Sequence, residues 1–185
     1  MRGGGGARIL RAMAKASTIV YPGTFDPMTL GHLDLVTRGA ALFDRLIIAV
    51  AAFSNKATGV FSLDERIEMC REACADLPNV EVKPMPGMLV DFVRAEGART
   101  VLRGLRAYSD FEYEFQMAQT NRKLAPEVET LFLMPKEEHS YVSSSIVREV
   151  ARFAGDTSRF VPPAVQRHIE RLVVLQRLRN PGAVP

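Results

Sequence analysis

The run Arg45–Ala52 (RLIIAVAA) constrains the fold more than any other stretch of this sequence. It is apolar after its first residue and too short for a typical helix. Such runs are typical of strands that are covered on both faces, as in parallel sheets. Further short apolar or alternating runs predict strands at 17–21, 79–83, 100–102 and 129–134.

Amphipathic stretches lie between these runs, and several carry signals for helix ends. Ser62–Glu65 and Ser109–Glu112 have the pattern of capping boxes, which start helices. Gly97 and Gly155 follow helical patterns and are expected to end them, and Pro162–Pro163 is expected to start the last helix. The predicted helices cover 30–43, a segment beginning at 62, 88–96, 109–124, 144–153 and 163–178.

Strands that alternate with helices predict an α/β fold. With right-handed crossovers, the expected architecture is a Rossmann-like, doubly wound, five-stranded parallel sheet with a C-terminal helical end. In such folds ligands bind at the carboxyl ends of the strands, near the point where the strand order reverses. The loops that follow strands are therefore the places to search for a site.

Length and charge narrow the function classes. The chain has 185 residues, and we expect a single domain over 17–180 with the glycine-rich residues 1–16 as a flexible extension. The net charge of +3 is mild and its arginines are scattered, with no basic stripe interleaved with aromatics, which disfavours nucleic-acid binding. No apolar run has the length of a membrane span, and basic residues interrupt any signal-peptide core. We expect a cytoplasmic protein.

Two cysteines, Cys70 and Cys74, lie four apart in a helical pattern. We interpret them as part of a buried apolar face. Their spacing does not fit a Cys-x-x-Cys redox or zinc motif, and the lack of a disulfide framework fits a reducing compartment.

The first predicted strand leads into the loop Tyr21–His32 (YPGTFDPMTLGH). Gly31 and His32 fall at a helix start, where free backbone N–H groups and the helix dipole favour a phosphate. His32 can donate a hydrogen bond to a phosphate oxygen there, and the dipole tends to lower its pKa. A turn histidine that only caps the helix is the alternative, and the complete string favours the phosphate role.

Cations follow two further strands. Lys56 comes after the run 45–52, at the edge where ligands bind, and its point charge suits a phosphate. Arg103 and Arg106 flank a glycine after the fourth strand, and their guanidinium forks match phosphate geometry. Surface arginines paired with nearby acids such as Asp110 are the alternative.

The segment His139–Ser145 (HSYVSSS) follows the fifth strand. Serines at a helix start are often only caps, but three in a row also offer hydroxyls and N–H groups to a triphosphate. On the helix before that strand, Phe111 and Phe115 have helical spacing and are predicted to lie in the core. Glu114 beside them is either a site residue or a solvated carboxylate.

These strings resemble those of a known family. Thr29-Leu-Gly-His32 resembles the His-x-Gly-His motif of the nucleotidylyltransferase superfamily, with threonine in place of the first histidine. GTFDPxTxGH, the Arg-Gly-x-Arg pattern at 103–106 and the serines at 143–145 are similar to those of bacterial phosphopantetheine adenylyltransferases. The resemblance covers roughly 17–175. It departs at His139, where an aromatic residue such as tryptophan is expected, and at 57–60, which is one residue longer.

The resemblance implies a role for each loop. His32 would stabilise the pentacoordinate α-phosphate of ATP, as a catalytic residue together with Lys56 and Arg106. The implied site for the acceptor comprises Thr24, Lys56, Leu89 and Arg103, although a plain core position explains Leu89 equally well. The implied ATP site comprises Thr24, Phe25, His32, Gly104, Leu105, Arg106, Glu114, His139, Ser140, Tyr141, Val142, Ser143, Ser144 and Ser145.

The implied reaction transfers the adenylyl group of ATP to 4′-phosphopantetheine, giving dephospho-coenzyme A and pyrophosphate, a step of coenzyme A biosynthesis. Mg²⁺ is expected to accompany ATP, with phosphates and water rather than a protein cage as its ligands. The resemblance also implies a homohexamer and inhibition by coenzyme A. One alternative is a related transferase that uses nicotinamide mononucleotide or glycerol 3-phosphate. The other is a nucleotide-binding regulatory module without catalysis. Thr29, Lys56 and Arg103 favour phosphopantetheine, and the presence of His32 argues against the regulatory module.

Overall fold

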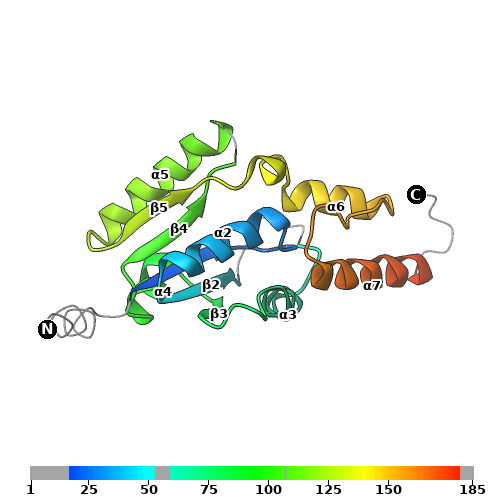
Figure 1. The fold of residues 1–185 in the computed structure, drawn as a ribbon, viewed down its shortest axis with the longest axis horizontal. Coiled ribbons are helices and arrows are strands. Elements are labelled where there is room, and N and C mark those ends of the chain that lie inside the picture. The colour runs from blue at the N-terminus through cyan, green and yellow to red at the C-terminus, as the bar shows by residue number, and fades with distance from the viewer. Residues whose placement is uncertain (1–16, 53–58, 107, 180–185) are drawn as a thin grey trace, which may run out of the picture.

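The computed structural model describes residues 17–52, 59–106 and 108–179, which form one sheet flanked by helices (Figure 1). The strands are β1 (Thr18–Gly23), β2 (Arg45–Ala51), β3 (Val80–Met85), β4 (Thr100–Gly104) and β5 (Glu129–Leu133). The helices are α2 (Leu30–Leu42), α3 (Leu63–Ala73), α4 (Leu89–Ala95), α5 (Tyr108–Leu124), α6 (Ser144–Arg152) and α7 (Pro163–Arg179), with the short 3-10 helix η1 (Glu137–His139) before α6. Within these ranges, no helix is both long and apolar enough to cross a membrane.

The predicted doubly wound parallel sheet is confirmed. All strand pairs are parallel, and the order is β3-β2-β1-β4-β5. The chain adds β2 and β3 on one side of β1 and then crosses through α4 to place β4 on the other side. The strand order therefore reverses between β1 and β4, and the loops after these two strands face a common crevice.

The apolar run of β2 is buried on both faces, as its composition predicts. Ile48 and Val50 face a large core shared with α2, α3, α6 and α7, whereas Ile47 and Ala49 face a smaller core shared with α4. This alternation is the two-residue period of a strand. Cys70 in α3 and Cys74 at its C-cap are free thiols buried in the large core, which confirms their structural interpretation.

One of the two predicted capping boxes forms. The backbone N of Ser62 donates to Glu65 Oε2 at 2.8 Å, and the N of Glu65 donates to Ser62 Oγ at 3.3 Å, so α3 begins as predicted. Helix α5, however, begins at Tyr108. Ser109 therefore lies inside the first turn, and the prediction that it caps this helix is wrong.

The C-terminal ends of α4 and α6 differ in their use of glycine. Gly97 has a φ of +65 after α4, the left-handed conformation expected of a terminating glycine. After α6, Ala154 adopts this conformation, with a φ of 55, so the left-handed residue lies one position before the glycine predicted to end the helix. A Cβ on Gly155 would lie 2.8 Å from Val150 Cγ1. This glycine permits close packing rather than the turn itself.

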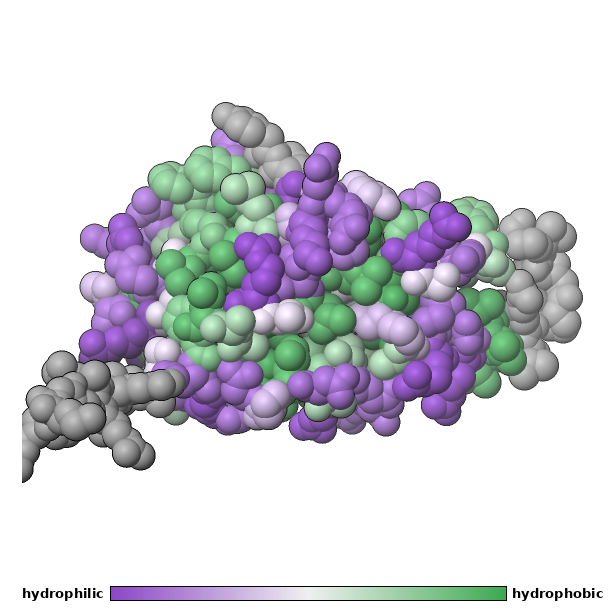
Figure 2. Space-filling model, viewed as in Figure 1, coloured by the Kyte–Doolittle hydropathy of each residue, from purple (hydrophilic) through white to green (hydrophobic). Residues whose placement is uncertain are grey.

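The prediction that Phe111 and Phe115 lie in the core is also wrong. Their exposed fractions are 48% and 47%, and their rings stack on each other with centroids 5.8 Å apart. Figure 2 shows hydrophobic residues at the surface over α5, at the upper left of this view. Helical spacing correctly puts the two rings on one face of α5, but that face points away from the core of this chain.

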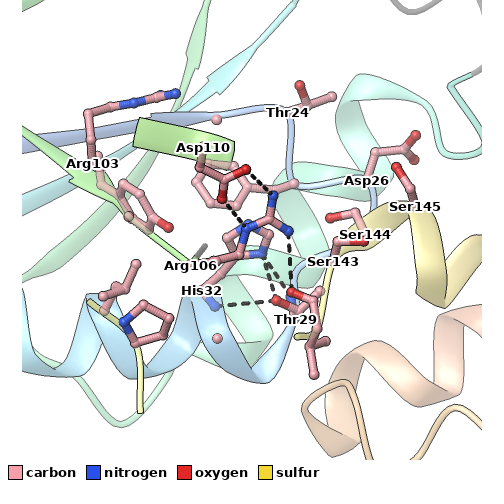
Figure 3. A pocket seen from close by; sticks show the side chains of 18 of the residues that line it. Thr24, Asp26, Thr29, His32, Arg103, Arg106, Asp110, Ser143, Ser144 and Ser145 are labelled. Carbon is pink, nitrogen blue, oxygen red and sulfur yellow. Dashed lines mark hydrogen bonds and ion pairs between the residues drawn. The ribbon is translucent and has the colours of Figure 1, made fainter. Parts of the chain in front are cut away.

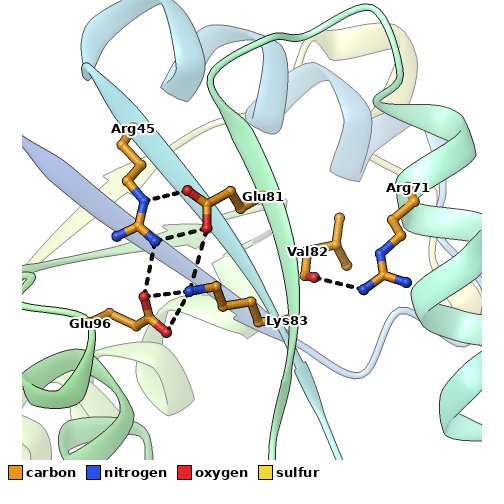
Figure 4. A network of polar contacts seen from close by, with 6 residues as sticks. All are labelled: Arg45, Arg71, Glu81, Val82, Lys83 and Glu96. Carbon is orange, nitrogen blue, oxygen red and sulfur yellow. Dashed lines mark hydrogen bonds and ion pairs between the residues drawn. The ribbon is translucent and has the colours of Figure 1, made fainter.

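A network of ion pairs joins β2, β3 and the end of α4 (Figure 4). Arg45 contacts Glu81 at 2.6 Å and Glu96 at 3.1 Å, and Lys83 contacts Glu96 at 2.8 Å. The hydrogen bond from Arg45 is the main reason that the pKa of Glu81 falls to about 2. Because β3 is an edge strand, these charges also discourage pairing with another chain at that edge.

Because of this network, part of the free energy of unfolding should depend on pH in the acid range. A carboxyl group with a depressed folded-state pKa stabilises above its unfolded pKa of about 4.3, and this contribution is lost as the pH falls through the folded value. We expect Glu81→Gln to lower the free energy of unfolding at pH 7 by less than ~1 kcal/mol, since the pair is partly exposed. The difference from wild type should shrink towards pH 2.5. Urea unfolding at several pH values measures it, with the exposed Glu112→Gln as the matched control.

Candidate active site

A cavity of about 680 Å³ opens at the carboxyl ends of β1 and β4, where the strand order reverses. The predicted site residues that line it are Thr24, Phe25, His32, Arg103, Gly104, Arg106, Glu114, Val142, Ser143, Ser144 and Ser145. Predicted residues that do not line it are Leu89, Leu105, His139, Ser140 and Tyr141. Lys56 lies outside the described residues. The structure thus brings together three segments that lie at or after the ends of β1, β4 and β5, with Glu114 from α5.

The loop between β1 and α2 folds its aromatic residue back under the cavity. Phe25 is 2% exposed, adopts a positive φ of 50, and packs edge-on against Tyr21 and His32 with ring centroids 5.4 and 5.2 Å apart. A Cβ at Gly23 would lie 2.8 Å from the ring of Phe25, so only a glycine at the end of β1 leaves room for this arrangement. The Asp26–Pro27 peptide bond is cis.

His32 caps α2 and also lines the cavity. The ring Nδ1 of His32 accepts a hydrogen bond from the backbone N–H of Thr29 at 3.0 Å, and the backbone N–H of His32 donates to Thr29 Oγ1 at 3.3 Å. Because a backbone N–H can only donate, Nδ1 carries no proton, and the proton of the neutral ring lies on Nε2. Burial lowers the pKa of His32 to about 4, and the charges of Arg106 and Arg103 add to this shift. The site therefore presents a neutral imidazole with an Nε2–H donor.

This assignment can be tested on the ligand-free protein. At pH 7, NMR of histidine-labelled protein should find the ring of His32 neutral with its proton on Nε2. Its titration midpoint should lie near 4, well below the ordinary value of about 6.5. A midpoint near 6.5, or a proton on Nδ1, would contradict the structure.

The two arginines at the carboxyl end of β4, Arg103 within the strand and Arg106 after it, have different partners. Arg103 contacts both carboxylate oxygens of Glu114, through Nε at 2.6 Å and Nη2 at 2.5 Å, and donates through Nη1 to the carbonyl of Pro22. Arg106 is more exposed, pairs with Asp110 at 3.0 Å, and reaches the carbonyl of Val142 at 3.4 Å (Figure 3). The solvated alternative for Glu114 is wrong, since its side chain is only 12% exposed.

The serines of α6 use their hydroxyl groups mainly within the protein. Ser143 Oγ accepts from the N–H of Ile146 as the N-cap, Ser144 Oγ donates to the carbonyl of Pro27 at 2.8 Å, and Ser145 Oγ accepts from Arg148. The first N–H groups of a helix have no partner within that helix, and they carry its positive dipole. The groups at the start of α6 that remain available to an anion are therefore chiefly its backbone N–H groups.

Three buried or partly buried polar residues near the cavity were not predicted from the sequence. Asp26 is 3% exposed, and its carboxylate accepts from the N–H groups of Val60 and Phe61 at 3.1 and 3.0 Å. Arg148 donates to the carbonyl of Asp26. The third residue, Arg66, is 7% exposed and donates to the carbonyls at the ends of β1 and β2. Asp26 and Arg148 lie 122 residues apart in the sequence, and only the tertiary fold reveals their contact.

The residues around the cavity fit a divalent cation that arrives with a nucleotide. The described part of the chain contains no cluster of three or more His, Cys, Asp or Glu side chains suited to a metal. The three carboxylates that line the cavity are Asp26, Asp110 and Glu114, and each is already paired with an arginine or with backbone N–H groups. Such a cation would take most of its ligands from phosphate oxygens and water.

Comparison with known proteins agrees with this geometry. The cytidylyltransferase-like family model matches residues 20–150. A phosphopantetheine adenylyltransferase of Alkalilimnicola ehrlichii is 59% identical over 157 residues, which are 84% of this chain and 90% of that protein. The enzyme of the same name from Aromatoleum aromaticum is 53% identical over 163 residues, which are 88% of this chain and 99% of that protein.

Solved structures share the fold at low sequence identity. A putative nicotinate-nucleotide adenylyltransferase from Vibrio parahaemolyticus has a TM-score of 0.64 at 14% identity, over 84% of this chain and 99% of that one. A bifunctional NMN adenylyltransferase/ADP ribose pyrophosphatase from Francisella tularensis has a TM-score of 0.67 at 14% identity, over 89% of this chain and 52% of that one. The sequence identities above decide the family: the chain belongs to the phosphopantetheine adenylyltransferases, within the cytidylyltransferase-like family.

Proposed function

We propose that this chain transfers the adenylyl group of ATP to 4′-phosphopantetheine, giving dephospho-coenzyme A and pyrophosphate. The observation that carries the proposal is a neutral histidine with an Nε2–H donor, held at a helix start in a cavity that it shares with three arginines and a second helix N-terminus. This is a set of donors for phosphates, and the relatives with this name supply the identity of the acceptor.

The chemistry is an in-line displacement at the α-phosphorus. An oxygen of the acceptor phosphate forms a bond to the α-phosphorus, the bond to the bridging oxygen of the β-phosphate breaks, and pyrophosphate leaves with that electron pair. The acceptor phosphate is already an anion, so no general base is needed. The protein contributes orientation and stabilisation of charge, in the way that preorganised hydrogen-bond donors act on other transition states.

The residues in each wall of the cavity have a distinct role in this reaction. His32 donates through Nε2 to an α-phosphate oxygen, and Arg106 and the N-terminus of α6 bind the phosphates that become pyrophosphate. Arg103, with Lys56, binds the acceptor phosphate. Leu89 packs against the smaller core, which favours its interpretation as a core residue over contact with the acceptor.

The remaining parts of the proposal concern the cation, the assembly and regulation. Mg²⁺ would enter with ATP and neutralise charge on the leaving pyrophosphate. The half-exposed stacked rings of Phe111 and Phe115 give one apolar face for contact with another copy of the chain, in line with the expected homohexamer. Inhibition by coenzyme A, a cytoplasmic location and a single domain over 17–180 stay predictions.

Pyrophosphate release tests the reaction and its acceptor. The protein is incubated with ATP and Mg²⁺ and with 4′-phosphopantetheine, nicotinamide mononucleotide or glycerol 3-phosphate. Release with 4′-phosphopantetheine alone is the expected result. Release only with another acceptor would keep the chemistry and overturn the substrate. ATP binding without release in any mixture would favour a regulatory module.

A further inference from the structure

Helix α6 holds the loop between β1 and α2 through donors to two consecutive carbonyl groups. Ser144 Oγ donates to the carbonyl of Pro27 at 2.8 Å, and Arg148 Nη1 donates to the carbonyl of Asp26. Arg148 Nη2 donates to Ser145 Oγ at 3.2 Å. Figure 3 shows Asp26 and Ser145 at the same end of the cavity. One guanidinium group thus bridges the loop that leads to His32 and the helix start that carries the serines.

The carboxylate of Asp26 ties a third segment to the same place. It lies 3.7 Å from Arg148 and accepts hydrogen bonds from the N–H groups of Val60 and Phe61. At 3% exposure this carboxylate depends on such charge-assisted partners. Asp26 and Arg148 therefore form one buried junction between the β1–α2 loop, residues 60–61 and α6.

We propose that Arg148 is a positioning residue for adenylyl transfer, which sets the distance between His32 and the start of α6 through Asp26 and Ser145. The proposal rests on the function given above. In that function one triphosphate must reach His32 with its α-phosphate and the start of α6 with its outer phosphates. The two walls come from positions more than 100 residues apart in the sequence, and the contacts of Arg148 with Asp26 span 122 residues.

Arginine suits this task better than lysine does. Its two Nη nitrogens lie in a rigid fork, so one side chain can hold the carbonyl of Asp26 and the hydroxyl of Ser145 at a fixed separation. A lysine keeps the positive charge but offers a single nitrogen on a flexible stem. The side chain of Arg148 is 18% exposed and lines the cavity, and both of its Nη nitrogens donate to protein acceptors. Its guanidinium group is thus engaged by Asp26 and Ser145, through which it would act.

A double-mutant cycle in the full-length protein tests the proposal. The turnover number kcat for pyrophosphate release is measured for wild type, Arg148→Lys, His32→Ala and the double variant, at saturating ATP and 4′-phosphopantetheine. Misplacement by about 1 Å costs on the order of a hundredfold in rate, so we expect Arg148→Lys to lower kcat about 10- to 100-fold. Thermal unfolding of each variant shows whether it is folded, and Arg152→Lys, one turn further along α6 and exposed, should behave like wild type.

The decisive result is the energetic coupling between Arg148 and His32, which lie in different walls of the cavity. If Arg148 positions the triphosphate for His32, then His32→Ala should cost about a hundredfold in the wild-type background and less than about tenfold in the Arg148→Lys background. The same fold loss of kcat from His32→Ala in both backgrounds would overturn the proposal, because it would mean that Arg148 acts independently of His32. So would a kcat for Arg148→Lys that equals that of Arg152→Lys.

ATP binding separates this proposal from the proposed function. Wild-type protein that releases no pyrophosphate would contradict the function but not the geometry of the junction. In that case calorimetric titration with ATP and Mg²⁺ decides: Arg148→Lys should weaken binding at least about fivefold and Arg152→Lys should not. Equal ATP affinity in both variants would overturn the positioning role.

Discussion

Replacing His32 by alanine should lower the rate of adenylyl transfer by about a hundredfold or more while ATP still binds. The Nε2–H of the neutral ring is a preorganised donor, and removal of one such donor typically costs this much. The ring is held in place by the N–H of Thr29 on one side and the edge of Phe25 on the other. The donor therefore needs little reorganisation when charge develops on the α-phosphate. Pyrophosphate release and calorimetric ATP titration measure the two parts of the prediction.

Two controls separate this catalytic role from the capping role of His32. Glutamine at the third position of a helix can complete a capping box, so His32→Gln should restore the stability lost in His32→Ala but only part of the rate. His168→Gln, on α7 and outside the cavity, should leave the rate unchanged. A His32→Ala variant with nearly wild-type kcat would reduce this residue to a helix cap.

The fold was largely predictable because its signals are local. The apolar run of β2 and the Ser62–Glu65 box each report on a few neighbouring residues, and both gave correct elements. The core position of Phe111 and Phe115 failed for a physical reason. Helical periodicity reveals which residues share a face, but not whether that face meets the sheet, the solvent or another chain.

The site was predictable only to the level of its loops. The sequence placed Arg106 and the serines correctly after their strands, whereas Arg103, predicted to follow its strand, lies near the end of β4 itself, which extends to Gly104. Neighbours in one loop, however, point in different directions: Ser143 lines the cavity, whereas Tyr141 is 63% exposed and does not line it. The junction of Asp26 with Arg148 was missed because its partners are joined only by the tertiary fold.

Replacing Arg103 by alanine should raise the KM for 4′-phosphopantetheine by about 10- to 100-fold. Hydrogen bonds to charged groups contribute roughly 1.5–3 kcal/mol, and each 1.4 kcal/mol corresponds to about tenfold in affinity. In the structure Arg103 is engaged by Glu114 through two short contacts. We therefore expect the acceptor phosphate to compete with Glu114 for this guanidinium. Steady-state kinetics with each substrate varied in turn measure the effect.

The variant Arg103→Ala also leaves the carboxylate of Glu114 unpaired, with its side chain 12% exposed, beside the position of the incoming phosphates. Repulsion from this charge would raise the acceptor KM even if Arg103 never touched the acceptor. The double variant Arg103→Ala/Glu114→Gln removes that repulsion. Its acceptor KM should stay high if Arg103 binds the acceptor phosphate, whereas recovery towards wild type would mean that Arg103 only neutralises Glu114. Glu114→Gln alone weakens the hold on the guanidinium and removes the repulsion, so it should lower the KM for the acceptor.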